Sequence, residues 1–439
     1  MAQVQNRISG IRVRGFKSLR SEQHISIRPL TILAGANSSG KSSVMQPFLL
    51  LKQTLEAPSD PGALLLNGEN VKFTRAEQLL AKDGNDEFAV QLELLNGQSL
   101  GLTFGRIERG FDLKEMTYGS QEDKISTIVP SMSHEDIMSI LPKPWDKIIR
   151  LTTAKYEKPT LAWKVFRDRC FFSFRITPHD DATPHIRFGP SGVSPGQLFA
   201  SHLEGIIHLP GLRGNPRRTY PKTSVGPSYQ GTFESYVASV IAEWQNPGKK
   251  GKMTNLAQNL EKMALTWKVK AEPFDDTQME LKVGRLTHAR QGGAHDMVSI
   301  ADVGIGISQS LPVLVALLAA QPGQLVYLEQ PEIHLHPLAQ RRLAGVLQEA
   351  VERGVITVVE THSAILLREL QTLIATGGLH KEDVAMHWLT RDEYGETTVT
   401  TAELDDNGAY GKWPEDFDST ELQAEQAYLD AVEAREASQ

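Results

Sequence analysis

The stretch Gly35-Ala36-Asn37-Ser38-Ser39-Gly40-Lys41-Ser42 reads G-x-x-x-x-G-K-S, the pattern of a phosphate-binding loop. A buried strand is predicted before it, over residues 30–34, and a helix after it, over residues 42–54, in which Pro47 is a candidate kink. This order of strand, loop and helix directs backbone N–H groups and the positive end of the helix toward phosphates. The sequence therefore predicts that the chain binds ATP or GTP.

The residue types in this loop have separate expected roles. Lys41 is expected to reach the β- and γ-phosphates, and the Ser42 hydroxyl is expected to ligate Mg²⁺. The cofactors predicted on this basis are ATP and Mg²⁺. The predicted nucleotide-binding residues of the loop and the helix start are Gly35, Asn37, Ser38, Ser39, Gly40, Lys41, Ser42 and Ser43.

The composition is that of a soluble globular protein. The 439 residues are 40% hydrophobic and 23% charged, and this length favours about two or three domains. The apolar stretch 311–320 is too short for a membrane helix, no basic and apolar leader opens the chain, and the single cysteine, Cys170, excludes an intrachain disulfide framework. We expect a cytoplasmic protein without membrane contact.

Charge is unevenly distributed along the chain. The segment from Glu403 to the end carries eleven acids against Lys412 and Arg435, so its own net charge is −9, while the whole chain has a net charge of −7. The rest of the chain is then near neutral at +2, which leaves only a local basic patch as a route to nucleic-acid binding. The acidic end itself is interpreted as a solvated tail.

The pattern divides the chain into four parts. Residues 1–105 contain the phosphate loop and a β-meander, with strands over 8–14, 88–95 and 99–104 and an Asn96-Gly97 hairpin turn. Residues 106–284 are rich in Pro and Gly and are interpreted as an α+β insertion with helices over 232–244 and 254–267, joined by a mobile loop at 249–252. Residues 285–402 resume the nucleotide fold, and residues 403–439 form the acidic tail with a helix over 421–436.

The third part alternates strands and helices. Strands are predicted over 324–328 and 354–359, and helices over 337–353 and 364–374. This alternation indicates a largely parallel sheet with crossover helices. The predicted fold class is therefore α/β, a P-loop nucleotide-binding fold with an N-terminal β-meander, an insertion and a C-terminal helix.

Three further segments of this part carry candidate site residues. The strand 324–328 ends in Glu329, a carboxylate placed to hold Mg²⁺ with Ser42. The strand 355–359 leads to Glu360-Thr361-His362, which places His362 where a γ-phosphate could sit, unless this histidine simply packs beside the next helix. The segment 302–310 places Ser308 and Gln309 before a predicted helix at 311–320, as a second anion-binding cap or as a structural turn.

The order of these motifs resembles the ABC-type ATPase heads of the SMC, RecF and OLD group. It is more closely similar to stand-alone bacterial ATPases of defence operons, such as the Septu and PARIS ATPases. The resemblance covers about residues 8–105 and 285–395, with a further tail motif at 413–418. It rests on Gly15-Phe16-Lys17-Ser18, on the phosphate loop 35–42, and on the segments 302–309, 329–337 and 360–363.

The resemblance implies a site shared between subunits. Ser308 and its neighbours are expected to contact the γ-phosphate bound to a second protomer of a homo-oligomer, and the turn at Phe16-Lys17 is expected to flank the nucleotide. His362 is the expected switch histidine. Gln330 stands where many ABC proteins have a glutamate base, and glutamine accepts no proton at neutral pH. Glu332 is the substitute candidate, so the predicted catalytic set is Glu329, Gln330, Glu332 and His362, with slow hydrolysis.

The resemblance also sets the expected biological role. The leading hypothesis is an ATPase that regulates a separately encoded nuclease effector in antiphage defence, because no nuclease domain follows the ATPase motifs. Two alternatives stay open: an ATPase acting directly on DNA ends, and a self-contained nuclease using His179, Asp180, Asp181 and His185. His334 and His336 are a weak candidate metal pair, and the arginine-containing loop 209–220 is a candidate for gripping phosphate or for internal salt bridges.

Overall fold

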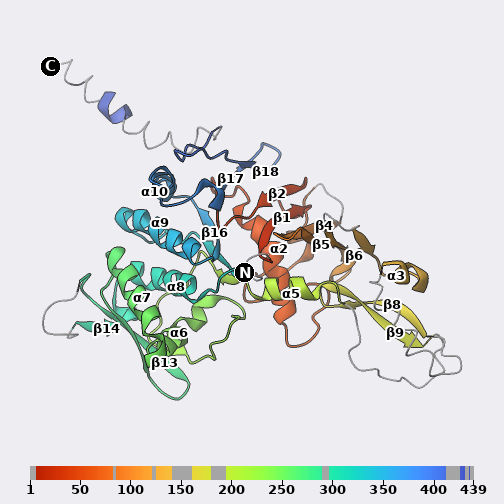
Figure 1. Ribbon diagram of the computed structural model, residues 1–439, viewed down its shortest axis with the longest axis horizontal. Coiled ribbons are helices and arrows are strands. Elements are labelled where there is room, and N and C mark those ends of the chain that lie inside the picture. Colours follow the sequence, from red (N-terminus) through yellow and green to blue (C-terminus); the bar gives the residue numbers. More distant parts are fainter. Residues whose placement is uncertain are drawn as a thin grey trace.

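A six-stranded sheet forms the centre of the molecule (Figure 1). The structure is a computed structural model that describes residues 6–82, 86–120, 125–140, 161–178, 194–288, 296–411, 426–430 and 435. The first five strands of this sheet run parallel and the last is antiparallel. In spatial order the strands are β10 (Ile207–Leu209), β15 (Leu325–Glu329), β16 (Ile356–Thr361), β3 (Leu30–Gly35), β17 (Val384–Arg391) and β18 (Thr397–Thr401).

Both faces of this sheet are covered, so β3 and β16 are buried at every position. On one face lie α8 (Ile305–Ala319), α9 (Pro337–Glu352) and α10 (Ala364–Ala375), whose apolar side chains share one core with the strands. On the other face lies α2 (Lys41–Glu56), with α5 (Gln197–Glu204) packed against it. The helix α2 continues through Pro47.

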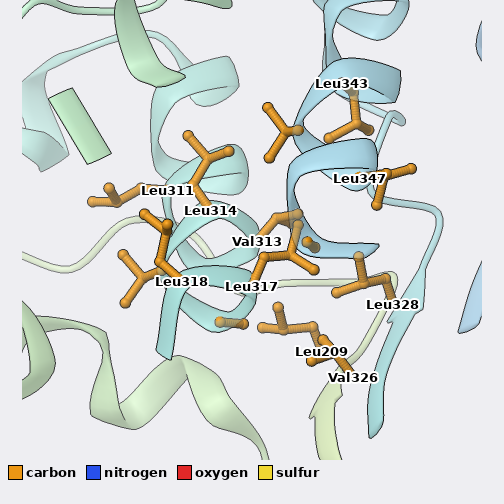
Figure 2. Packing of buried hydrophobic residues seen from close by; sticks show 14 of the residues in the cluster. Leu209, Leu311, Val313, Leu314, Leu317, Leu318, Val326, Leu328, Leu343 and Leu347 are labelled. Atoms are coloured by element: carbon orange, nitrogen blue, oxygen red, sulfur yellow. The ribbon is translucent and has the colours of Figure 1, made fainter. Parts of the chain in front are cut away.

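Helix α8 is apolar on all sides and is buried along most of its length. Figure 2 shows Leu314 and Val313 among side chains of α9 and of the sheet strands. The helix begins at Ile305, with Gly304 as its N-cap. The predicted start at residue 311 is therefore wrong, and Ser308 lies inside the first turn of the helix rather than before it.

An antiparallel sheet lies beyond α2. In spatial order its strands are β2 (Gln23–Ser26), β1 (Ile8–Arg14), β4 (Glu87–Leu94), β5 (Gln98–Ile107), β6 (Gly110–Ser120) and β7 (Ser126–Ile128). The predicted meander is confirmed, since Glu93 pairs with Ser99 across the Asn96-Gly97 turn. A separate hairpin, β8 (Leu161–Asp168) and β9 (Phe171–Pro178), extends to the right in Figure 1 beside α3 (His134–Ile140).

A lobe of two helices and a small sheet packs against α8, at the lower left of Figure 1. Its elements are β11 (Tyr220–Pro221), α6 (Val237–Trp244), α7 (Lys250–Lys262), β12 (Val269–Pro273), β13 (Gln278–Gly284) and β14 (Met297–Ser299). Residues 250–252 form the first turn of α7, which corrects the predicted mobile loop. The second predicted helix is correspondingly shifted, and it ends at Lys262 instead of Trp267.

The predicted divisions of the chain do not coincide with the edges of its sheets. Residue 105 lies inside β5, and β6 and β7 extend the same sheet. From the middle of the predicted insertion, β10 adds to the central sheet beside β15, and β14 pairs with β13 across residue 284. The tail motif 413–418 lies outside the described residues, and of the tail helix only residues 426–430 and 435 are described, as helical.

Within the part of the chain that the structure describes, no helix combines the length and the apolar character that a membrane span requires.

A buried histidine ties the two sheets together and makes the fold sensitive to acid. The His387 ring hydrogen-bonds the Ser26 carbonyl through Nε2 and the Thr401 hydroxyl through Nδ1, each at 2.9 Å. Burial lowers the pKa of His387 to about 4, whereas the unfolded chain takes up this proton at a pKa of about 6.5. Because the unfolded state then binds more protons between these values, stability falls as the pH drops through this window.

We therefore predict that the free energy of unfolding falls between pH 7 and pH 5 by about 2 kcal/mol more in the wild type than in His387→Asn. Urea denaturation at the two pH values measures this difference. Equal losses in the two proteins would contradict the role assigned to His387.

Candidate nucleotide site

The phosphate loop joins β3 to α2 at the carboxyl edge of the central sheet. Its glycines Gly35 and Gly40 are required by geometry. Gly35 has a φ of 149° and a side chain there would lie 2.4 Å from the Leu389 carbonyl oxygen, while Gly40 has a φ of 100° and would meet Thr397 Oγ1 at 2.5 Å. Thr397 Oγ1 also hydrogen-bonds the Ser39 carbonyl at 2.8 Å. The β17–β18 hairpin thus supports the loop.

A pocket of about 780 Å³ opens over this loop. Its lining contains more basic than acidic side chains, which suits a polyanionic ligand such as a triphosphate. The loop residues predicted to bind nucleotide line it, apart from Gly35 and Ser39, and so do Gln330 and His362. The basic residues of the lining are Lys17, Arg20, Lys41, Lys82 and Arg391, and the acidic ones are Glu77, Glu360 and Glu393.

The turn at Phe16-Lys17 lies beside the loop, since Lys17 lines the same pocket; its expected contact with the nucleotide stays a prediction. Lys17 has a φ of 53°, and its ammonium donates to Gln46 Oε1 at 2.5 Å and lies 4.5 Å from the centre of the Phe73 ring. Burial lowers the pKa of Lys17 to about 8. An anionic phosphate in the pocket would favour its charged form.

Lys41 is folded back onto the loop. Its ammonium donates to the Gly35 and Ala36 carbonyl oxygens at 3.0 and 2.7 Å. Burial lowers the pKa of Lys41, and the nearby charges of Glu360 and Glu332 act in the opposite direction. The loop carbonyl oxygens thus hold the Lys41 ammonium at the edge of the pocket.

The Ser42 hydroxyl donates to Glu360 Oε2 at 2.9 Å. The other Glu360 oxygen accepts from the buried Tyr327 hydroxyl. Burial, followed by the charge of Glu329, raises the pKa of Glu360 to about 7, against the hydrogen bonds that favour its charged form. The sequence prediction did not include Glu360 among the site residues, although its place directly before Thr361-His362 at a strand end was a usable signal.

Glu329 lies beside Glu360, since these residues pair in register on β15 and β16. Its Oε1 is 3.0 Å from His208 Nε2, and its Oε2 accepts from the Gly211 N–H at 3.1 Å. Burial alone would raise the pKa of Glu329, but the bonds from His208 and Gly211 outweigh it, and the pKa is lowered. The predicted joint contact of Glu329 and Ser42 with Mg²⁺ stays a prediction.

The remaining predicted catalytic residues occupy the segment after β15 and the end of β16. Gln330 lines the pocket with a φ of 44°, and its N–H donates to the Glu360 carbonyl at 2.9 Å. Glu332 is buried, and its Oε1 accepts from Thr361 Oγ1 at 2.5 Å and from the His362 N–H at 3.0 Å. Burial raises the pKa of Glu332 and lowers that of His362. Glu332 therefore holds the turn that carries His362.

Ser308 lines a different pocket, of about 170 Å³, and Gln309 is the next residue of α8. The Ser308 hydroxyl donates to the Ile305 carbonyl at 2.9 Å within α8. Arg213 connects this region to the phosphate loop side, because its guanidinium donates to Gln309 Oε1 at 3.3 Å and to the Gln330 carbonyl at 3.2 Å. The phosphate loop and Ser308, which were predicted to contact one nucleotide from two subunits, thus lie in separate pockets of one chain. Arg213 joins these two regions.

The weaker candidates for metal or phosphate binding make structural contacts or lie outside the described residues. His336 is the N-cap of α9, where its side chain accepts from the Leu338 N–H at 3.3 Å. Arg218 pairs with Asp302 at the surface, so the loop 209–220 forms internal contacts through both Arg213 and Arg218. His179, Asp180, Asp181 and His185 lie outside the described residues. Within the described ranges, no three His, Cys, Asp or Glu side chains gather as a metal-binding group.

Comparison with known proteins gives one family match. Residues 241–368 match the model of a family described as "AAA domain, putative AbiEii toxin, Type IV TA system". The matched segment contains Ser308, Glu329 and His362, and the phosphate loop precedes it. No curated protein matches the chain.

Among solved structures, the chain is similar to three SMC head domains. An SMC head bound to the C-winged helix domain of ScpA has 12% identity and a TM-score of 0.46, covering 91% of this chain and 98% of its own. The SMC head domain from Thermotoga maritima has 10% identity and a TM-score of 0.38, covering 90% and 99%. An Smc head domain with an extended coiled coil, bound to the C-terminal domain of ScpA derived from Pyrococcus furiosus, has 11% identity and a TM-score of 0.42, covering 97% and 99%.

The predicted fold class is confirmed. A phosphate loop between β3 and α2, a central sheet with crossover helices and an antiparallel sheet beyond α2 form an ABC-type ATPase head. The chain thus has the fold of an ABC-type ATPase head, and its residues 241–368 match a family of AAA domains.

The hydrogen bonds of Arg213 predict that replacing it lowers the stability of the fold. Arg213→Met leaves the Gln309 side chain and the Gln330 carbonyl without this donor, so we expect the free energy of unfolding to fall by about 2 kcal/mol. Arg218→Met removes an exposed ion pair and should change it by less than about 0.5 kcal/mol. Denaturant unfolding of both variants checks this, and equal effects would contradict the prediction.

Proposed function

We propose that this chain binds ATP with Mg²⁺ and hydrolyses it. The observation that carries the proposal is the pocket over the phosphate loop, into which Lys41 and Ser42 face together with His362. The residues also suit the metal, since a hydroxyl and two carboxylates are the hard oxygen donors that Mg²⁺ takes beside phosphates. Ser42 with Glu329 or Glu360 would hold the ion, which would neutralise charge on the phosphates.

We further propose that two copies of the chain close around the nucleotide. In this arrangement Lys41 of one copy and Ser308 of its partner contact the same triphosphate, which accounts for their places in different pockets of one chain. Exposed apolar side chains on neighbouring segments support this arrangement: Leu212, 89% exposed, lies on the loop of Arg213, and Ile305 starts α8. Ile333 and Leu338 are exposed on the segment around His334, whose carbonyl lies next to Gly306.

Self-association is tested by mass measurement of the full chain with a nonhydrolysable ATP analogue. We expect wild type to double in mass, and Ser308→Arg to stay monomeric and to lose about 10-fold or more in turnover. Lys41→Ala should abolish both nucleotide binding and doubling. The exposed Ser131→Arg serves as the control and should behave as wild type. Single chains in every wild-type sample, with unchanged turnover in Ser308→Arg, would refute the shared site.

Hydrolysis is proposed to be slow. Gln330 lines the pocket and stands where the resemblance expects a glutamate base, whereas Glu332 does not line the pocket, and its Oε1 accepts from Thr361 and the His362 N–H. Neither group is then disposed to take a proton from water.

We predict a turnover below about 10 per second, the typical enzyme value, and a rise of about 10-fold or more in Gln330→Glu because a carboxylate base becomes available. Steady-state phosphate release measures both numbers. Fast hydrolysis by the wild type, or no gain in the variant, would contradict the assignment.

In the cell, we propose that the ATP state regulates a separate nuclease effector in antiphage defence. The resemblance of the motifs to defence ATPases supports this role, and the description of the matched family, which names a toxin–antitoxin system, is compatible with it. Neighbouring genes provide the test, because an adjacent nuclease reading frame is expected. DNA cleavage or salt-dependent DNA binding by the purified chain alone would instead favour the two alternative functions.

A further inference from the structure

Strand order places two carboxylates at unequal distances from the phosphate loop. β16 lies between β3, which leads into the loop, and β15. Glu360 on β16 is therefore one strand away from the loop strand, and Glu329 on β15 is two strands away. The two side chains share one side of the sheet, because paired residues on parallel strands point the same way.

The surroundings of the two carboxylates differ as well. Glu360 lines the pocket and accepts from the Ser42 hydroxyl at 2.9 Å, while Glu329 does not line it. Both oxygens of Glu329 are occupied on the side away from the loop, by His208 on β10 and by the Gly211 N–H. Glu360 receives its bonds from two hydroxyls, and none of the ion pairs among the described residues involves it. A cation beside Ser42 would meet Glu360 first.

We propose that Glu360, and not Glu329, is the carboxylate that faces Mg²⁺ together with Ser42. Glu329 is a positioning residue in this arrangement, since it fixes His208 and the loop at Gly211 behind the site. The inference rests on the proposed binding of Mg²⁺ and ATP at this loop. The sequence analysis combined Ser42, which follows β3, with Glu329 on β15. The inference assigns the metal contact to Glu360 on β16, the strand that lies between them.

Binding of an ATP analogue with and without a metal separates the two carboxylates without requiring turnover. The full chain is titrated with a nonhydrolysable ATP analogue, alone and with Mn²⁺, and bound Mn²⁺ is followed by its electron paramagnetic resonance signal. We expect Glu360→Gln to weaken Mn²⁺ retention by about 10- to 100-fold, and Glu329→Gln to weaken it at least about 5-fold less. Glu115→Gln on β6, a carboxylate that does not line the pocket, should match wild type.

The possible results are distinguishable. A loss in Glu329→Gln that equals or exceeds the loss in Glu360→Gln overturns the assignment. If Glu360→Gln has a lowered thermal unfolding midpoint, Glu360→Asp is compared with it, because Asp keeps a carboxylate that can face the metal. Glu360→Asp should then retain Mn²⁺ better than Glu360→Gln, and an equal loss in both variants overturns the assignment. If the wild type binds no analogue at all, with Lys41→Ala indistinguishable from it, the proposed function fails and this inference fails with it.

Discussion

The burial of Glu360, with the partly buried Glu329 beside it, at one edge of a parallel sheet is the constraint on which the site depends. Glu329 and Glu360 lie opposite each other on β15 and β16, and buried carboxylates cost several kcal/mol each unless hydrogen-bond donors surround them. The donors come from distant parts of the chain: Ser42 at the start of α2, Tyr327 on β15, and the segment that contains His208. Satisfying these two groups therefore requires the phosphate loop, both strands and the middle of the chain to fold together.

This requirement explains why the middle of the chain is integrated into the ATPase head. β10 extends the central sheet beside β15, which brings His208 next to Glu329 and stacks its ring on Tyr327 at 5.3 Å. Three residues further on, the Gly211 N–H donates a hydrogen bond to the second oxygen of Glu329. Arg213 on the same segment donates to the Gln309 side chain and to the Gln330 carbonyl. One short segment thus joins the pocket over the phosphate loop to the start of α8 through direct contacts.

The sequence predicted the parts of the fold that are coded locally. The loop between β3 and α2, the helix α9 and the strand β16 each follow from hydrophobic pattern and turn residues within a short window. It did not predict that Ser42 contacts Glu360, because that contact follows from β16 lying between β3 and β15, which is a property of the whole sheet. His208 was missed for a similar reason: its strand has three residues, too few for a pattern, and the surrounding Pro and Gly residues indicated an insertion.

The position of Glu360 also bears on the rate of hydrolysis. With Glu332 turned toward Thr361 and the His362 N–H, and with glutamine at position 330, Glu360 is the buried acidic group that the pocket contains. A carboxylate that holds a metal ion is a weak base toward attacking water, because the nearby positive charge stabilises its deprotonated form. If Glu360 serves the metal, the described lining of the pocket offers no second buried carboxylate as a base. A nucleotide bound between two copies would then persist long enough to act as an assembly signal. The placement of Glu360 beside Ser42 that would complete a metal site would thus also favour slow turnover.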